Sequence, residues 1–305
     1  MNGGGRRFLP QREIYTQGFD MLERTFCHLK GIGNTTEAKI WDSGISSWSD
    51  IVKGADMPFS DAKISELERG CSESLERLKG RDPRWFADRL PASDQWRMYS
   101  HFQDNIAYID IETTGTDAHS CDITTIALWN GREVKTYVQG RNLYDFEDEI
   151  AKYFMIVSFN GKCFDVPFIE KYFGLKINAA HIDLRFVFRS LGITGGLKGI
   201  EQYFGIDRGD AAGLDGYFAV LLWNEYEMSG NEKALETLLA YNVLDSVNLE
   251  NLMIKAYNLH IERFPQHDLA PILEAVVPDN PFNAHISVVD SIRRRYPSGG
   301  SFRKF

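Results

Sequence analysis

The sequence has no long apolar run and few cysteines. Its longest apolar stretch is Tyr217–Trp223, far shorter than the roughly 20 residues that a membrane-spanning helix needs. The N-terminal residues include arginines but no apolar segment typical of a secretory signal. The four cysteines show no Cys-x-x-Cys spacing, which argues against a zinc knuckle or a disulfide framework. We therefore expect a cytoplasmic protein without a membrane partner.

Basic residues are also scarce. The sequence holds 34 Lys and Arg against 43 Asp and Glu, a formal net charge of −9. Proteins that hold long stretches of duplex are usually basic, so bulk charge does not supply that kind of binding here. An acidic balance suits a carboxylate-rich metal site, although it also suits most cytosolic proteins. The content of 43% hydrophobic and 25% charged residues excludes a disordered, collagen-like or coiled-coil chain.

The residue pattern changes near residue 104, which predicts a division of the chain. Residues 1–80 are expected to form a helical region. Residues 81–103 are rich in Pro, Arg and aromatics, lack a clean period and are expected to be a linker. Residues 104–262 would form the main domain, and 263–305 a C-terminal extension that is partly flexible.

The main domain is predicted to be a mixed α/β sheet. Strands are expected at Ile106–Ile111, Ile123–Trp129, Glu133–Val138, Ile156–Phe159 and Ala180–Leu184, with a two-residue hairpin at Asn130-Gly131. Helices are expected at Asp61–Leu78, Asp145–Tyr153, Val166–Phe173, Leu197–Tyr203, Tyr217–Tyr226 and Ala234–Leu259. An antiparallel meander followed by helical crossovers predicts five strands, three antiparallel and the later ones parallel, flanked by helices.

Two carboxylates stand at the end of the first predicted strand. Residues i and i+2 of a strand point to the same face, so Asp110 and Glu112 project together, beside the turn that begins at Thr113. Two carboxylates on one face repel each other unless a positive charge lies between them. The alternative is a solvated strand end.

A third acid lies where the fourth predicted strand gives way to a helix. Asp165 follows the turn at Asn160-Gly161 and lies at the start of the helix. Folds of the α/β class gather ligands at such junctions. The alternative is that Asp165 is the N-cap of that helix.

The long helix predicted near the C-terminus contributes Tyr241 and Asp245, which are neighbours on one helix face. They lie beside leucines in the helical wheel, so we expect both to point at least partly inward. An inward aspartate needs a partner or a metal. The alternatives are a Tyr–Asp hydrogen bond or a solvated helix edge.

Together these segments predict a metal site. Four oxygen ligands from separate elements suit hard divalent cations such as Mg²⁺ or Mn²⁺. Zinc would prefer His or Cys, and the seven histidines show no His-x-x-x-His spacing. Two hard cations roughly 4 Å apart can clamp the attacking and leaving oxygens of a phosphodiester.

The three segments resemble a known family. DIETTG, SFNGKCFDVPFI and YNVLD resemble the three motifs of the DEDD (DnaQ-like) 3′–5′ exonucleases, and the Tyr-x-x-x-Asp form indicates the DEDDy branch. The resemblance implies an RNase H-like fold. The chain is also similar to the YprB-like RNase H-like proteins over roughly residues 20–260, including the segments WFADRLP, GLKGIEQYFGI and LDGYFAVLLWNEY.

This resemblance implies a role for each acid and two Mg²⁺ or Mn²⁺ ions. Asp110 would bridge both ions and Glu112 would bind one. Asp245 would hold the ion that carries the attacking water, and Asp165 would help to position the second ion. With an ordinary pKa near 10, Tyr241 is a poor base, so it would orient the water.

Substrate contacts are predicted at Thr113, Asn160 and Lys198. Asn160 could touch substrate, although bracing the active-site turn is the favoured role. Lys198 could approach a phosphate, and the alternative is a surface lysine. The implied function is 3′–5′ exonuclease action on nucleic acid, with DNA favoured over RNA and single-stranded DNA ends as substrate. The alternatives are an RNA-directed or structure-specific nuclease at the same site and a non-catalytic nucleic-acid-binding module.

A separate motif lies in the N-terminal region. Residues 26–41 resemble a helix-hairpin-helix, in which Gly31 and Gly33 would present backbone N–H groups to nucleic-acid phosphates. Glu37 stands where a small residue is usual, and Asn34 with Glu37 also fits a variant of the capping box. The alternative to nucleic-acid contact is a module that only packs against the rest of the protein.

Overall fold

The computed structural model describes residues 20–209, 216–264 and 269–296. At its centre is a five-stranded sheet of order β3-β2-β1-β4-β5. β2 pairs antiparallel with β1 and β3, whereas β4 pairs parallel with β1 and β5, which confirms the predicted mixed sheet. The strands are β1 (Ile106–Thr113), β2 (Ile123–Trp129), β3 (Val134–Val138), β4 (Met155–Ser158) and β5 (Ala180–Asp183).

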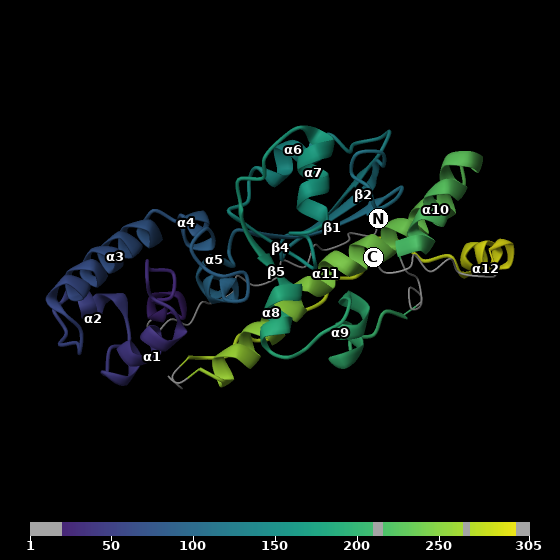
Figure 1. Ribbon diagram of the computed structural model, residues 1–305. Helices are drawn as coiled ribbons and strands as arrows, with labels where there is room; N and C mark the ends of the chain where they lie inside the picture. The colour runs from purple at the N-terminus through teal and green to yellow at the C-terminus, as the bar shows by residue number, and fades with distance from the viewer. Residues whose placement is uncertain (1–19, 210–215, 265–268, 297–305) are drawn as a thin grey trace, which may run out of the picture.

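Most of the helices form two groups along the chain (Figure 1). The N-terminal group comprises α1 (Asn34–Asp42), α2 (Trp48–Val52), α3 (Asp61–Lys79), α4 (Pro83–Ala87) and α5 (Tyr99–Phe102), with short 3-10 turns at Leu22–Arg24 and Gln95–Met98. The sheet is joined by α6 (Asp145–Ile150), α7 (Asp165–Phe173), α8 (Leu184–Ser190), α9 (Leu197–Tyr203), α10 (Gly216–Ser229) and α11 (Glu232–Glu262). Across the described ranges, none of the helices combines the length and apolar character needed to cross a membrane.

Opposite faces of the sheet are covered by different helices. Figure 1 shows α6 and α7 on one side of the strands and the long α11 on the other. Ile109 and Ile111 of β1 pack into the core formed with α6 and α7. Ile106 and Tyr108 pack into the core that includes α11. Because side chains alternate along a strand, this arrangement decides which β1 residues can meet α11.

The connection between β2 and β3 is longer than predicted. Residues 130–133 form the loop, so the two-residue hairpin is wrong. The commonest two-residue hairpin needs a positive φ at both central residues, and of the Asn130-Gly131 pair only Gly131 has one, at 81°. The Asn130 side-chain oxygen instead accepts hydrogen bonds from the backbone N–H groups of Arg132 and Glu133, each at 3.0 Å.

Residues 81–103 contain structure of their own. They form α4, α5 and the 3-10 turn between them, and their large aromatic side chains are buried. Trp96 stacks on His260 near the end of α11, with 4.3 Å between the ring centroids. Trp41 of α1 packs edge-on against Phe264, which follows α11, with 4.6 Å between the ring centroids. The N-terminal helices therefore share one core with α11 and the sheet.

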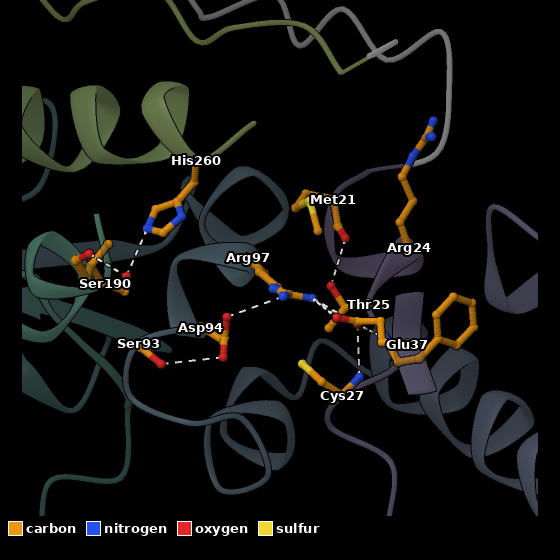
Figure 2. Close-up of polar contacts among 12 residues, drawn as sticks. Met21, Arg24, Thr25, Cys27, Glu37, Ser93, Asp94, Arg97, Ser190 and His260 are labelled. Atoms are coloured by element: carbon orange, nitrogen blue, oxygen red, sulfur yellow. Dashed lines mark hydrogen bonds and ion pairs between the residues drawn. The ribbon is translucent and has the colours of Figure 1, made fainter. Parts of the chain in front are cut away.

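Glu37 is a buried anchor of the N-terminal region (Figure 2). Its Oε1 accepts hydrogen bonds from the backbone N–H groups of Phe26 at 2.6 Å and Cys27 at 3.0 Å. Both carboxylate oxygens also pair with Nη1 of Arg97, at 2.9 and 3.0 Å. The glutamate thus ties the segment before α1 to the turn before α5.

The start of α1 differs from the sequence-based expectation. Gly33 is the N-cap, and within the described residues no side chain caps this helix, so the Asn34–Glu37 capping box is wrong. Glu37 turns inward to the neighbouring segment rather than back to the helix start. This burial supports the packing alternative for the region, and contact of Gly31 and Gly33 with nucleic acid stays a prediction.

After α11 the chain returns in extended form along that helix. Asn251 pairs with both backbone groups of Ala275: its Nδ2 donates to the carbonyl at 3.0 Å and its Oδ1 accepts from the N–H at 2.8 Å. Asn258 pairs with Ile272 in the same way, with both distances 2.8 Å. Two side chains of α11 thereby hold the returning segment.

The C-terminal extension also contains a helix that the sequence analysis does not predict. α12 (Ile286–Arg295) buries Val288, Val289 and Ile292 in a core shared with α10 and α11. The last part of the basic end, residues 297–305, for which flexibility is expected, lies outside the described residues.

We predict that Arg97→Met lowers the free energy of unfolding by about 3 kcal/mol, because it leaves the Glu37 carboxylate buried without its cation. Urea unfolding of the full chain measures the change. Arg69→Met, at an exposed arginine of α3, is the control and should stay within about 0.5 kcal/mol of the unsubstituted protein. Equal effects of the two substitutions would contradict an anchoring role for the Glu37–Arg97 pair.

Candidate active site

The end of β1 presents two carboxylates to α11. Strand alternation sends Ile109 and Ile111 toward α6 and α7, so Asp110 and Glu112 lie on the opposite face. The pairing of β1 with β2 shifts register between Glu112 and Thr113, which marks a bulge at the strand end. Asp110 is half-buried and Glu112 is 9% exposed.

α11 supplies a third carboxylate to the same place. Tyr241 and Asp245 are 4% and 5% exposed, which confirms the predicted inward orientation. One carboxylate oxygen from each of Asp110, Glu112 and Asp245 lies within 4.8 Å of the others. Residues that are far apart in the sequence are therefore close enough to share a cation.

Asp165 approaches the cluster from α7. It is the first residue of the helix, whose N-cap is Phe164, so the N-cap alternative for Asp165 is wrong. Its Oδ1 accepts a hydrogen bond from the backbone N–H of Ile111 in β1, at 3.3 Å. Ile111 lies between Asp110 and Glu112, so this hydrogen bond ties the start of α7 to the part of β1 that carries both acids. Asp165 is not one of the three acids whose oxygens lie within 4.8 Å of one another.

Asn242 is a site residue that the sequence analysis missed. Its Nδ2 donates to the Oδ2 of Asp110 at 2.7 Å and to the Asp110 carbonyl at 3.1 Å. Its Oδ1 accepts from the hydroxyl of Thr125 in β2 at 2.9 Å. The fully buried amide thus fixes Asp110 relative to both α11 and the sheet. Its position directly after Tyr241 in the sequence is a feature that could have indicated its role in the site.

A second missed feature is an ion-pair network on the α9 side. Arg208 pairs through Nη2 with Asp245 and through Nη1 with Glu201 of α9. Asn248 of α11 donates to the other oxygen of Glu201 at 2.7 Å. Arg208 follows α9 in a segment without hydrophobic periodicity, so no pattern in the sequence indicated this contact.

Burial and mutual repulsion shift the titration of the carboxylates. Burial, followed by the charge of Asp245, raises the pKa of Asp110 and the pKa of Glu112 well above their usual range. Burial raises the pKa of Asp165 to about 7. Burial also raises the pKa of Asp245, and the neighbouring Arg208 opposes that shift. Without added positive charge, the cluster therefore resists full ionisation.

Tyr241 lies among these acids and under two cations. Burial, and then the charges of Asp245 and Glu112, raise the pKa of its hydroxyl well above 10. Lys198 Nζ lies 4.6 Å from the ring centroid and the guanidinium carbon of Arg208 lies 5.3 Å from it. Tyr241 therefore keeps its proton at neutral pH, and Lys198 is a half-buried neighbour of the site.

The other predicted substrate residues take part in local structure. The hydroxyl of Thr113 donates to the carbonyl of Gly115 at 2.6 Å. Asn160 has a positive φ of 66°, and its N–H donates to Asp183 at 2.8 Å, as expected of a residue that braces a turn. Gly33 is the N-cap of α1 and Gly31 lies two residues earlier. Figure 1 shows α1 in the N-terminal group of helices, away from β1.

Comparisons with known proteins bear on the fold. No curated protein matches the chain. Among solved structures, the chain is similar to the family B DNA polymerase of the hyperthermophilic archaeon Pyrobaculum calidifontis, with 16% identity and a TM-score of 0.39. The similarity covers 50% of this chain and 26% of the polymerase, so it spans about a quarter of the polymerase's length. Residues 107–257 match the family model of the RNase H superfamily. This match, together with the mixed five-stranded sheet and its flanking helices, identifies an RNase H-like α/β fold.

Proposed function

We propose that the protein is a divalent-metal-dependent 3′–5′ exonuclease of the DEDDy branch, YprB-like, that acts on single-stranded DNA ends. The observation that carries the proposal is that three carboxylates from β1 and α11 meet at one place, while a fourth, on α7, is hydrogen-bonded to β1 between two of them. The acids are Asp110, Glu112, Asp165 and Asp245. The RNase H-like fold supports hydrolysis of nucleic acid, and Tyr241 one turn before Asp245 supports the DEDDy assignment.

The donor set suits magnesium or manganese. The cluster consists of carboxylates, the hard oxygen ligands that these ions prefer. Their burial makes the accumulated negative charge unfavourable unless cations lie among them. Asp110, Glu112, Asp165 and Asp245 would hold two ions. When bound there, the ions would stabilise developing negative charge and activate water for attack on a phosphodiester.

The protein's own groups would set the geometry of the reaction. The Tyr241 hydroxyl, which keeps its proton, would orient the attacking water by a hydrogen bond rather than act as a base. Asn242 would keep Asp110 in place. The ammonium group of Lys198 lies beside Tyr241, where it could meet a phosphate of the substrate. The local hydrogen bonds of Thr113 and Asn160 favour turn-stabilising roles for both.

The substrate and the direction of cleavage are tested with labelled oligonucleotides. A 5′-labelled strand incubated with Mg²⁺ or Mn²⁺ should give a ladder that shortens from the 3′ end, and EDTA should abolish it. A circular single strand should resist cleavage. Cutting of the circle would instead support a structure-specific nuclease. Preference for RNA would change the substrate, and binding without cleavage would support a non-catalytic module.

We predict that Asp110→Asn and Asp245→Asn each lower the cleavage rate by at least about 100-fold, because each removes a metal ligand. Tyr241→Phe should lower the rate by about 10- to 100-fold, because water is held less well while the ligands remain. Initial rates on the 5′-labelled strand measure these effects.

Asp56→Asn, at an exposed aspartate near α2, is the matched control and should cleave normally. Circular dichroism of every variant checks that the fold is retained. Full activity in folded Asp245→Asn protein would rule out the assigned metal site.

We predict a pH-dependent effect of Asp165→Asn on metal-free protein. Asp165 binds its proton more tightly when folded, with a pKa of about 7, than when unfolded, at about 4. The stability that its proton contributes is therefore present at low pH and is lost as pH rises through this window. Relative to the unsubstituted protein, the free energy of unfolding of Asp165→Asn should therefore rise by about 1 kcal/mol for each pH unit between about pH 4 and pH 7.

Urea unfolding in EDTA between pH 5 and 8 measures this difference. Asp56→Asn should show the same pH dependence as the unsubstituted protein. Parallel stability curves for Asp165→Asn and the unsubstituted protein would show that Asp165 does not hold a proton in the folded cluster.

A further inference from the structure

Arg208 brings a fixed positive charge into the carboxylate cluster. Its guanidinium joins Asp245 to Glu201, one nitrogen to each. The Arg208 side chain is 8% exposed, and those of Asp245 and Glu201 are 7% and 1% exposed. A single cation is therefore shared between two carboxylates where water cannot screen the charges.

Glu201 is held independently of Asp245. Its Oε1 accepts a hydrogen bond from Asn248 of α11 at 2.7 Å, in a fully buried contact. Glu201 itself lies on α9, which packs against α11. Arg208 consequently keeps an anchored, buried partner even when its contact with Asp245 is lost.

The contact with Asp245 occupies an oxygen of a candidate metal ligand. A guanidinium and a divalent cation repel each other strongly at contact distance in a buried site, so they compete for Asp245. Among the described residues, the buried Nε of Arg208 has no hydrogen-bond partner. The hydrogen bonds that the described residues make to this guanidinium therefore go through Nη1 and Nη2, to Glu201 and Asp245.

We propose that Arg208 is an internal counter-cation, which pairs with both Asp245 and Glu201 while the site lacks metal and releases Asp245, keeping Glu201, when a divalent cation binds. This inference rests on the metal site of the proposed function. Arg208 would relieve repulsion among the acids in the metal-free protein and would weaken metal binding by the free energy of its Asp245 contact. Glu201 is the positioning residue that draws Arg208 away.

Mn²⁺ binding to the full-length protein tests the exchange. Free Mn²⁺ is followed by electron paramagnetic resonance during titration of metal-free protein. Arg208→Gln should bind Mn²⁺ about 5- to 100-fold more tightly, because no guanidinium competes for Asp245. Glu201→Gln should bind Mn²⁺ more weakly, because Arg208 then has only Asp245 as a charged partner.

The double substitution separates exchange from simple charge effects. In the Arg208→Gln background, Glu201→Gln should weaken Mn²⁺ binding less than it does alone, because there is no arginine left to redirect. Thermal unfolding gives a second readout. Arg208→Gln should lower the midpoint of the metal-free protein and enlarge the rise in midpoint that Mn²⁺ produces.

Arg141→Gln is the matched control, because Arg141 forms an exposed ion pair with Glu232, about 20 Å before Asp245 along α11. It should leave Mn²⁺ affinity unchanged. Mn²⁺ affinity of Arg208→Gln that is weaker, or within about twofold of the unsubstituted protein, would overturn the exchange. Equal effects of Glu201→Gln in both backgrounds would overturn it as well. Absence of Mn²⁺ binding in all the proteins would overturn the metal site itself together with this inference.

Discussion

Repulsion among neighbouring carboxylates at the end of β1 is the constraint to which the surrounding structure responds. Each acid is matched by a group from another element. The N–H of Ile111 donates to Asp165, and the amide of Asn242 donates to Asp110. The charges of Lys198 and Arg208 act on Glu112. Because these groups come from β1, α9, α11 and the segment after α9, the cluster can be assembled only once the elements have docked.

Local periodicity was enough to predict the orientation of three of the four acids. The two-residue period of a strand put Asp110 and Glu112 on one face, and the helical period put Tyr241 and Asp245 inward, where the structure has them. α9 has the predicted bounds, and the mixed sheet was predicted from the order of strands and helices. These features depend on residues that are close in the sequence, so a single sequence contains the information.

Contacts between distant segments could not be predicted in the same way. Arg208 lies in a segment without a period, and nothing beside it indicates that Asp245 and Glu201 are its partners. Glu37 occupies a position near a helix start that usually faces solvent, yet its partner Arg97 lies 60 residues away. Residues 81–103 lack a repeating pattern because their aromatic side chains pack in different directions. Trp96 contacts His260 near the end of α11, whereas Phe86 stacks on Trp48 of α2.

The pairing of Asn251 with Ala275 and of Asn258 with Ile272 also fixes the number of residues between Ile272 and Ala275. Seven residues of helix rise about 10.5 Å, and three residues of extended chain span about 10 Å. These two distances match, so both asparagines can hydrogen-bond to the antiparallel segment at the same time. Inserting or deleting one residue between Ile272 and Ala275 would leave one amide facing the wrong backbone groups. The spacing within this stretch is thus tied to the rise of α11.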